Sequence, residues 1–189
     1  HSGERIQGIS TGIPPTLTST ENFDSINYTY TTSGVSIISN ELVYSISAND
    51  VRAYKAFTIT DDSNWVINFD CYTGSGNSGH VSSCFVLSQG NSRPRGGSTN
   101  DAFLFRLNNT GGNVTLYINE YINGSNNQQV PTVTISQNTQ YYMQISRNGS
   151  TIYWKAYTSD SNRTNDISAS TVSLSLSGTS VQGINYIQH

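Results

Sequence analysis

Hydrophobic and polar residues alternate on both sides of an Asn-Gly pair between positions 141 and 157, and this pattern predicts a β-hairpin. Asn148-Gly149 favours a two-residue type I′ turn, because both residues tolerate the positive φ angles that this turn needs. The first face then pairs Ile145 with Ile152, Met143 with Trp154 and Tyr141 with Ala156, and the second pairs Gln144 with Tyr153 and Tyr142 with Lys155. The first face is apolar, so we expect it to be buried, with Trp154 in the core.

A second hairpin is predicted around Thr110-Gly111-Gly112. It pairs Leu107 with Val114, Phe105 with Leu116 and Phe103 with Ile118 on an apolar face, and Arg106 with Thr115 and Leu104 with Tyr117 on the other. Two hairpins that each bury one face need opposing sheets to cover them. The sequence therefore predicts an all-β fold, a two-sheet antiparallel β-sandwich.

Period-two runs separated by turn residues recur along the rest of the chain, and no long stretch has helical periodicity. The predicted strands are 34–39, 41–48, 51–60, 64–72, 80–89, 101–108, 113–122, 129–136, 140–147, 150–158 and 171–177. Glycines and prolines interrupt residues 1–20, which we expect to be an extended linker or assembly strand before a single sandwich domain at 21–189. The last apolar run, 181–187, is expected to close a sheet beside the N-terminal strand.

The composition predicts a weakly charged surface that is rich in hydroxyl and amide groups. Charged residues make up 11% of the chain, which carries a net charge of −3 and 12 tyrosines. Such a surface is typical of extracellular, cell-surface or virion-surface proteins. It offers no basic footprint for nucleic acid, and no apolar run reaches the length of a membrane-spanning helix.

Two features could add covalent modifications. Cys71 and Cys84 lie in apolar runs on either side of a Gly/Ser/Asn loop, so a hairpin could join them in a disulfide; two free buried thiols are the alternative. Sequons for N-glycosylation occur at Asn27, Asn108, Asn113, Asn123, Asn148 and Asn162.

The order of several segments resembles a known superfamily. ENFDS, GVSIISNELVYSI, DDSNWVINFDCY, YYMQISRNGSTIYWKAYTSDSNRT and SLSLSGTSVQGINYI are similar to a concanavalin A-like jelly roll, closest to laminin-G-like surface and phage or virion modules. The resemblance implies two curved sheets and a concave face that often binds glycan.

The same superfamily includes polysaccharide hydrolases and lyases, but we expect no enzyme here. Glycoside hydrolysis generally needs a pair of carboxyl groups, and Glu120 stands alone on its predicted strand. No catalytic residue and no cofactor are therefore predicted. Calcium is an alternative at 61–64 and 160–162, where the polar residues otherwise cap strand ends.

Aromatic and polar residues on the second face of the first hairpin are the strongest functional signal. Tyr142, Gln144, Tyr153, Lys155 and Tyr157 could stack on sugar rings and bond their hydroxyls, or could simply brace neighbouring strands. The sequence thus predicts a non-enzymatic adhesion or structural module that contacts glycans.

The alternative partner is another copy of the chain. Ile6, Ile9 and Ile13 could place the N-terminal segment in a neighbour's sheet, which would make the protein a filament or capsid subunit. If a neighbouring loop or the 1–20 segment covered the aromatic face, the glycan-binding hypothesis would fail and the assembly hypothesis would take its place.

Overall fold

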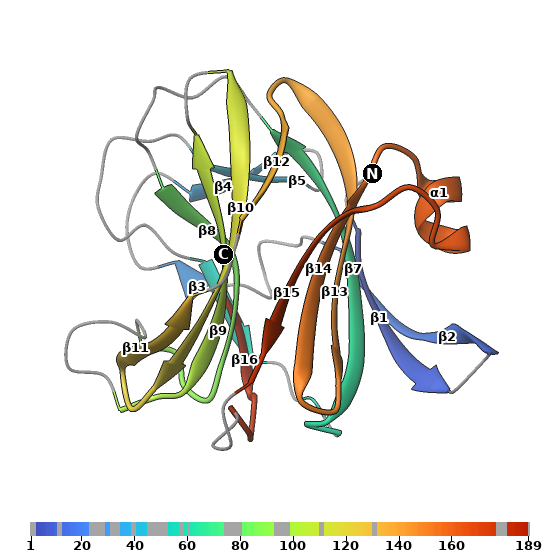
Figure 1. Cartoon of the computed structure of the whole chain (residues 1–189). Helices are drawn as coiled ribbons and strands as arrows, with labels where there is room; N and C mark the ends of the chain where they lie inside the picture. The colour runs from blue at the N-terminus through green and yellow to red at the C-terminus, as the bar shows by residue number, and fades with distance from the viewer. Residues whose placement is uncertain are drawn as a thin grey trace.

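Two antiparallel β-sheets pack face to face in the computed structural model of the chain (Figure 1). The structure describes residues 3–10, 13–22, 29–30, 35–38, 41–44, 53–56, 59, 61–73, 81–92, 99–109, 112–129, 132–176 and 181–188. The predicted all-β sandwich is confirmed. Within these ranges no helix has the length and apolar character needed to cross a membrane.

Sheet A has six strands and carries the first predicted hairpin. Their order is β15 (Ser170–Ser175), β14 (Thr151–Tyr157), β13 (Thr139–Asn148), β7 (Asn64–Thr73), β1 (Gly3–Ser10) and β2 (Ile13–Asn22). A short helix, α1 (Asp160–Asn165), connects β14 to β15. In Figure 1, α1 and the β1–β2 hairpin both project from sheet A on the side away from sheet B.

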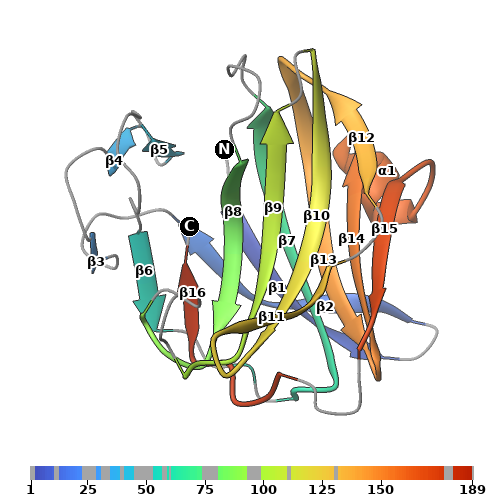
Figure 2. The same cartoon turned by 60° about the vertical axis from the view of Figure 1, so that its left-hand side comes forward.

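Sheet B has eight strands and carries the second predicted hairpin (Figure 2). Seven follow the order β11 (Ser125–Gln129), β10 (Asn113–Ile122), β9 (Ala102–Asn109), β8 (Val81–Ser88), β16 (Tyr186–Gln188), β6 (Ala53–Ala56) and β3 (Thr29–Tyr30), while β12 (Val133–Ser136) pairs with β10. β4 (Val35–Ile38) and β5 (Glu41–Tyr44) form a separate two-stranded sheet.

The core between the sheets contains the side chains that the sequence predicted. The residues expected to be buried are fully so: Phe103, Phe105, Leu116, Ile118, Met143, Ile145 and Trp154 are each 0% exposed. The indole of Trp154 meets the ring of Phe105 edge-on, with centroids 5.6 Å apart. Burial of these side chains on both inner faces supplies the main driving force for packing the two sheets.

The register of both hairpins differs from the prediction by two residues. Ile145 lies opposite Trp154 instead of Ile152, and Phe105 lies opposite Ile118 instead of Leu116. A shift of two residues keeps every side chain on its predicted face. In the first hairpin the loop is Gly149-Ser150, and of these two only Gly149 has positive φ (57°), as in a type II′ turn.

The N-terminal and C-terminal strands belong to different sheets. β1 pairs with β7, where Ile6 lies opposite Ile67, so most of the segment predicted to be extended forms a hairpin of sheet A. The C-terminal strand β16 lies between β6 and β8 of sheet B, so its predicted place beside the N-terminal strand is wrong. The division of the chain into a segment and a domain at residue 20 stays a prediction.

Candidate functional site

The predicted glycan-binding residues all lie on the outer face of sheet A, the face directed away from sheet B. Along β14, Ile152, Trp154 and Ala156 are buried in the core, and the residues between them point the other way. The same alternation holds on β13. The outer face therefore carries Tyr142 and Gln144 from β13, and Tyr153, Lys155 and Tyr157 from β14. The shared face predicted from sequence is thus present, although not all of it is accessible.

Helix α1 lies on one end of this face and is held at both termini. Ser159 caps its start, because the Ser159 Oγ accepts a hydrogen bond from the Asn162 backbone N–H at 3.1 Å. Asp166 ends it in the left-handed conformation (φ 52°), and its N–H donates to the Arg163 carbonyl at 3.3 Å. These local interactions stabilise a helix of only six residues, which is too short to persist alone.

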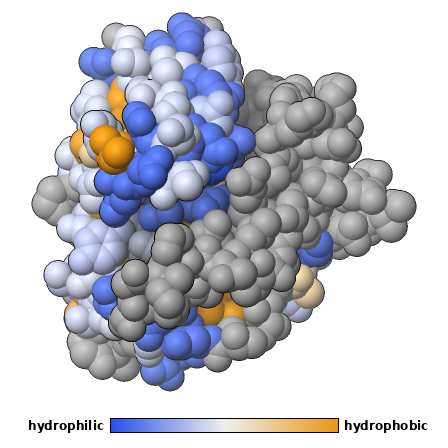
Figure 3. All heavy atoms as spheres, turned by 90° about the vertical axis from the view of Figure 1, so that its right-hand side faces the viewer, coloured by the Kyte–Doolittle hydropathy of each residue, from blue (hydrophilic) through white to orange (hydrophobic). Residues whose placement is uncertain are grey.

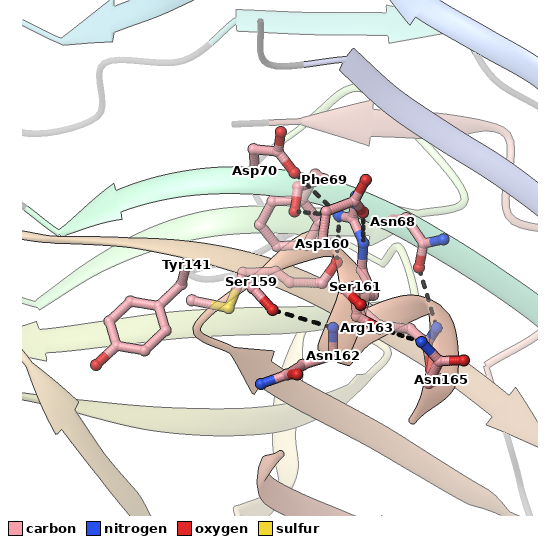
Figure 4. A network of polar contacts seen from close by, with 12 residues as sticks. Asn68, Phe69, Asp70, Tyr141, Ser159, Asp160, Ser161, Asn162, Arg163 and Asn165 are labelled. Carbon is pink, nitrogen blue, oxygen red and sulfur yellow. Dashed lines mark hydrogen bonds and ion pairs between the residues drawn. The ribbon is translucent and has the colours of Figure 1, made fainter. Parts of the chain in front are cut away.

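Arg163 anchors α1 to the sheet through a network of polar contacts (Figure 4). Its side chain is only 4% exposed and pairs with Asp160 at 2.6 Å and with Asp70 of β7 at 3.0 Å. The guanidinium also donates to the carbonyls of Phe69 and Met143 on two neighbouring strands. The buried charge is therefore compensated by two carboxylates and hydrogen-bonded to the backbone of both strands.

The helix covers two of the five predicted residues. The Arg163 guanidinium lies 5.5 Å from the centroid of the Tyr142 ring, which is half-buried. Tyr157 is 0% exposed and donates its hydroxyl hydrogen to Asp166 at 2.6 Å. A fully buried ring cannot stack on a sugar, so the assignment of Tyr157 as a glycan contact is corrected: it packs beneath the segment around α1.

Asp166 links α1 to β14 and organises the edge of the covered area. Lys155 donates to both Asp166 carboxylate oxygens, at 2.7 and 2.8 Å. These bonds, with the one from Tyr157, lower the pKa of Asp166 below its ordinary value. Burial and the bond to Asp166 raise the pKa of Tyr157, so its phenol stays protonated. Lys155 therefore pairs with Asp166, and the residue opposite it on β13 is Gln144, not the predicted Tyr142.

Tyr153 and Gln144 complete the predicted set on the outer face of sheet A. Tyr153 is half-buried and has serines directly opposite on both sides, Ser146 on β13 and Ser173 on β15. Gln144 donates to the Asn68 Oδ1 of β7 at 3.1 Å. This part of the face therefore combines two half-buried side chains, Tyr153 and Gln144, with a buried amide at Asn68.

The surface seen from this side is mainly hydrophilic over the described residues, as Figure 3 shows. Two large hydrophobic side chains are exposed among those described, Tyr72 at 62% and Ile167 at 53%. Tyr72 belongs to β7 and Ile167 follows α1. Thus the described part of this surface has no extended apolar patch.

Carboxylates that could have served catalysis or calcium are engaged in other contacts. Glu120 is 0% exposed, on the inner face of sheet B, and accepts a hydrogen bond from Asn127 at 2.7 Å. Asp61 accepts from the Ser63 backbone N–H, which lowers the pKa of Asp61, and Asp160 binds Arg163. No group of three or more His, Cys, Asp or Glu residues arranged to hold a metal is found in the described ranges.

The expected disulfide is absent. Cys71 has a free thiol on β7 and packs against the hydrophobic core, where burial raises its pKa to about 12. β7 and β8 do not form the hairpin that would have joined the cysteines; they belong to opposite sheets. The side chain of Cys84 lies outside the described residues.

The sequons differ in accessibility. Asn113, Asn123 and Asn148 are exposed, and Asn162 is half-buried on α1. Asn108 is half-buried, and its amide donates to the Tyr117 hydroxyl at 3.3 Å. Asn27 lies outside the described residues. Glycosylation of any of them stays a prediction.

Sequence reasoning missed the residues that shape this site from other segments: Asn68, Asp70, Arg163 and Asp166. No periodic pattern identifies α1, because its single buried side chain is the charged Arg163. Ser159 before Asp160 is a helix-capping signal, but it is weak without the glutamate or glutamine of a capping box.

Comparison with known proteins gives no further guide. No protein-family model, curated protein sequence or solved structure matches this chain.

Proposed function

We propose that this protein is a non-enzymatic adhesion or structural module that binds glycan on the outer face of sheet A. The proposed contact residues are Tyr153, Gln144 and Lys155, with the accessible part of Tyr142. Tyr153 would supply a ring for the C–H face of a sugar, and the amides and amine would bond to hydroxyls. The resemblance to concanavalin A-like jelly rolls of the laminin-G-like type supports this proposal.

The observation that carries it is the position of Tyr153. A tyrosine that only braces a sheet is expected to face large cross-strand partners, whereas Tyr153 faces Ser146 and Ser173. Its partly exposed ring stands next to the Gln144–Asn68 amide pair across β13 and β7. Rigid strands hold these groups in place, so a ligand would pay little to order them.

The proposed setting is the outside of a cell or a virion. Only 11% of residues are charged, and serine, threonine and asparagine are abundant along the chain. Such a surface would contact carbohydrate through hydrogen bonds and stacking, with little long-range electrostatic steering.

A second candidate function, assembly with copies of itself, rests on the edge of sheet A. Among the described strands β2 is the last of that sheet, and its outer edge could offer backbone groups to a strand of a neighbouring molecule. In this form the N-terminal segment would remain in its own sheet and also bind the neighbour.

A glycan array probed with the whole chain tests the proposed function. We expect binding to at least one family of oligosaccharides, and loss of that binding in Tyr153→Ala with an unchanged melting temperature. Failure of the folded protein to bind any glycan of a broad array would contradict the proposal.

A further inference from the structure

We propose that the glycan bound by this face is electrically neutral, built from hexoses or N-acetylhexosamines instead of uronic, sialic or sulfated sugars. The inference rests on the function proposed above and concerns the same site. It follows from the pairing of Lys155 and Arg163, the two cations whose side chains are described on this face.

Lys155 is the only cation beside Tyr153 on β14, and it is already neutralised. Both oxygens of Asp166 accept from its amine, at 2.7 and 2.8 Å. Asp166 is itself fixed as the C-cap of α1 and by the Tyr157 hydroxyl at 2.6 Å. An acidic sugar would have to compete with a carboxylate that the fold holds in place.

Arg163 is equally unavailable to an anionic ligand. Its side chain is 4% exposed, and Asp70 and Asp160 occupy its donors. With Lys155, the described side chains of this area supply two cations against three carboxylates, which leaves one net negative charge. An anionic sugar would therefore find neither of these two cations free to pair with it, whereas a neutral sugar needs no such partner.

Apart from the third donor of the paired Lys155 amine, the groups that remain for a ligand are uncharged. Gln144 uses an amide hydrogen on Asn68, and its Oε1 accepts no hydrogen bond from the described residues, so it can accept from a sugar hydroxyl. Thr171 and Ser173 of β15 are exposed and lie opposite Lys155 and Tyr153. An aromatic ring among hydroxyls and amides matches a neutral hydroxylated chain.

The substitution Asp166→Asn tests this pairing directly. Asparagine tolerates the left-handed conformation of residue 166, and its carbonyl oxygen can still accept from Tyr157, so the fold should be retained. The variant removes the negative charge that neutralises the Lys155 amine. Asp61→Asn is the matched control: it removes the same charge at an exposed turn before β7, and its carbonyl oxygen can still accept from Ser63.

The wild type and both variants are applied to an array of neutral oligosaccharides of glucose, mannose, galactose and N-acetylglucosamine, and of acidic oligosaccharides of galacturonate, mannuronate and sialic acid. We expect the wild type to bind neutral members only. Asp166→Asn should raise binding to acidic members relative to neutral ones by roughly two- to fivefold, the size of a partly exposed ion pair. Asp61→Asn should not change this ratio.

Each contrary outcome has a distinct meaning. Preference of the wild type for acidic members would overturn the inference and leave the glycan-binding function intact. The inference would also be overturned if the wild type bound neutral oligosaccharides and Asp166→Asn showed no gain in binding to acidic ones. In that case the pairing of Lys155 with Asp166 would not determine the selectivity. Binding of no member by the folded wild type would refute the proposed function itself.

Discussion

At the scale of residues, Trp154 is the clearest test of the packing. It is 0% exposed and contacts Phe105 edge-on across the two sheets. We expect Trp154→Ala to lower the free energy of unfolding by about 3–5 kcal/mol, through lost transfer energy and the cavity left behind. Urea denaturation measures this.

Tyr153→Ala is the matched control for this substitution, because the two positions are adjacent on β14 and face opposite sides. It should change the free energy of unfolding by less than about 1 kcal/mol. Equal losses for the two variants would show that the faces of β14 have been assigned incorrectly.

The Asp166 carboxylate predicts a pH-dependent term in stability. Its pKa in the folded protein is lowered, mainly by the hydrogen bonds from Lys155 and then by the one from Tyr157. This contribution is therefore complete above the unfolded pKa, about 4, and is lost as the pH falls through the lower folded value.

We expect wild type to be more stable than Asp166→Asn at pH 7, and the difference to shrink as the pH falls below about 4 through the lowered folded pKa. Chemical denaturation of both proteins at several pH values measures it. A difference that is the same at pH 7 and pH 3 would mean that the carboxylate charge contributes nothing to folding.

The sequence predicts on which face of the sheet a residue lies, but it does not predict how exposed that residue is. Alternation placed Tyr157 correctly on the outer face of sheet A. Its complete burial depends on α1 and Asp166, which follow it in the chain. The alternation of side chains along a strand does not show which later segments of the chain will cover its outer face.

At the scale of elements, the docking of α1 depends on Arg163. Replacing this side chain with methionine keeps its length but leaves Asp70, whose side chain is 18% exposed, without its buried partner. We expect Arg163→Met to cost about 2–4 kcal/mol. Thr164→Ala, at an exposed position of the same helix, should change stability by less than about 0.5 kcal/mol.

Both variants can be compared by urea denaturation and by hydrogen exchange of the amides in α1. Faster exchange in Arg163→Met alone would accompany the predicted loss. Similar stability and exchange in the two variants would argue that α1 is held to the sheet by contacts other than those of Arg163.

The strands were predictable as elements because their pattern is strong, whereas register and α1 were not. A two-residue slip leaves the apolar residues of β13 and β14 facing the core, so hydrophobicity alone cannot detect it. The turn decides it, through the single positive φ of Gly149. The six residues of α1 are polar throughout and give no amphipathic signal.

At the scale of the whole molecule, the N-terminal strands distinguish a binding module from an assembly subunit. β1 pairs with β7, so deletion of residues 1–22 would leave the edge of β7 unpaired. We expect the truncated protein to self-associate more than the whole chain, because open edges pair with other strands. Analytical ultracentrifugation of both proteins at several concentrations measures this.

The assembly hypothesis predicts the opposite sign. If the N-terminal segment joins neighbouring molecules, the whole chain should assemble with rising concentration and the truncated protein should not. That result would favour a filament or capsid subunit over the binding module proposed here.

The most direct test of the central claim, a glycan site on the outer face of sheet A, is the affinity of Tyr153→Ala for an oligosaccharide that the wild type binds. Isothermal titration should show a loss of roughly tenfold or more. Tyr117→Ala, a half-buried tyrosine on the outer face of sheet B, should bind as the wild type does. Unchanged affinity in Tyr153→Ala with loss in Tyr117→Ala would place the site on the other sheet and contradict the account.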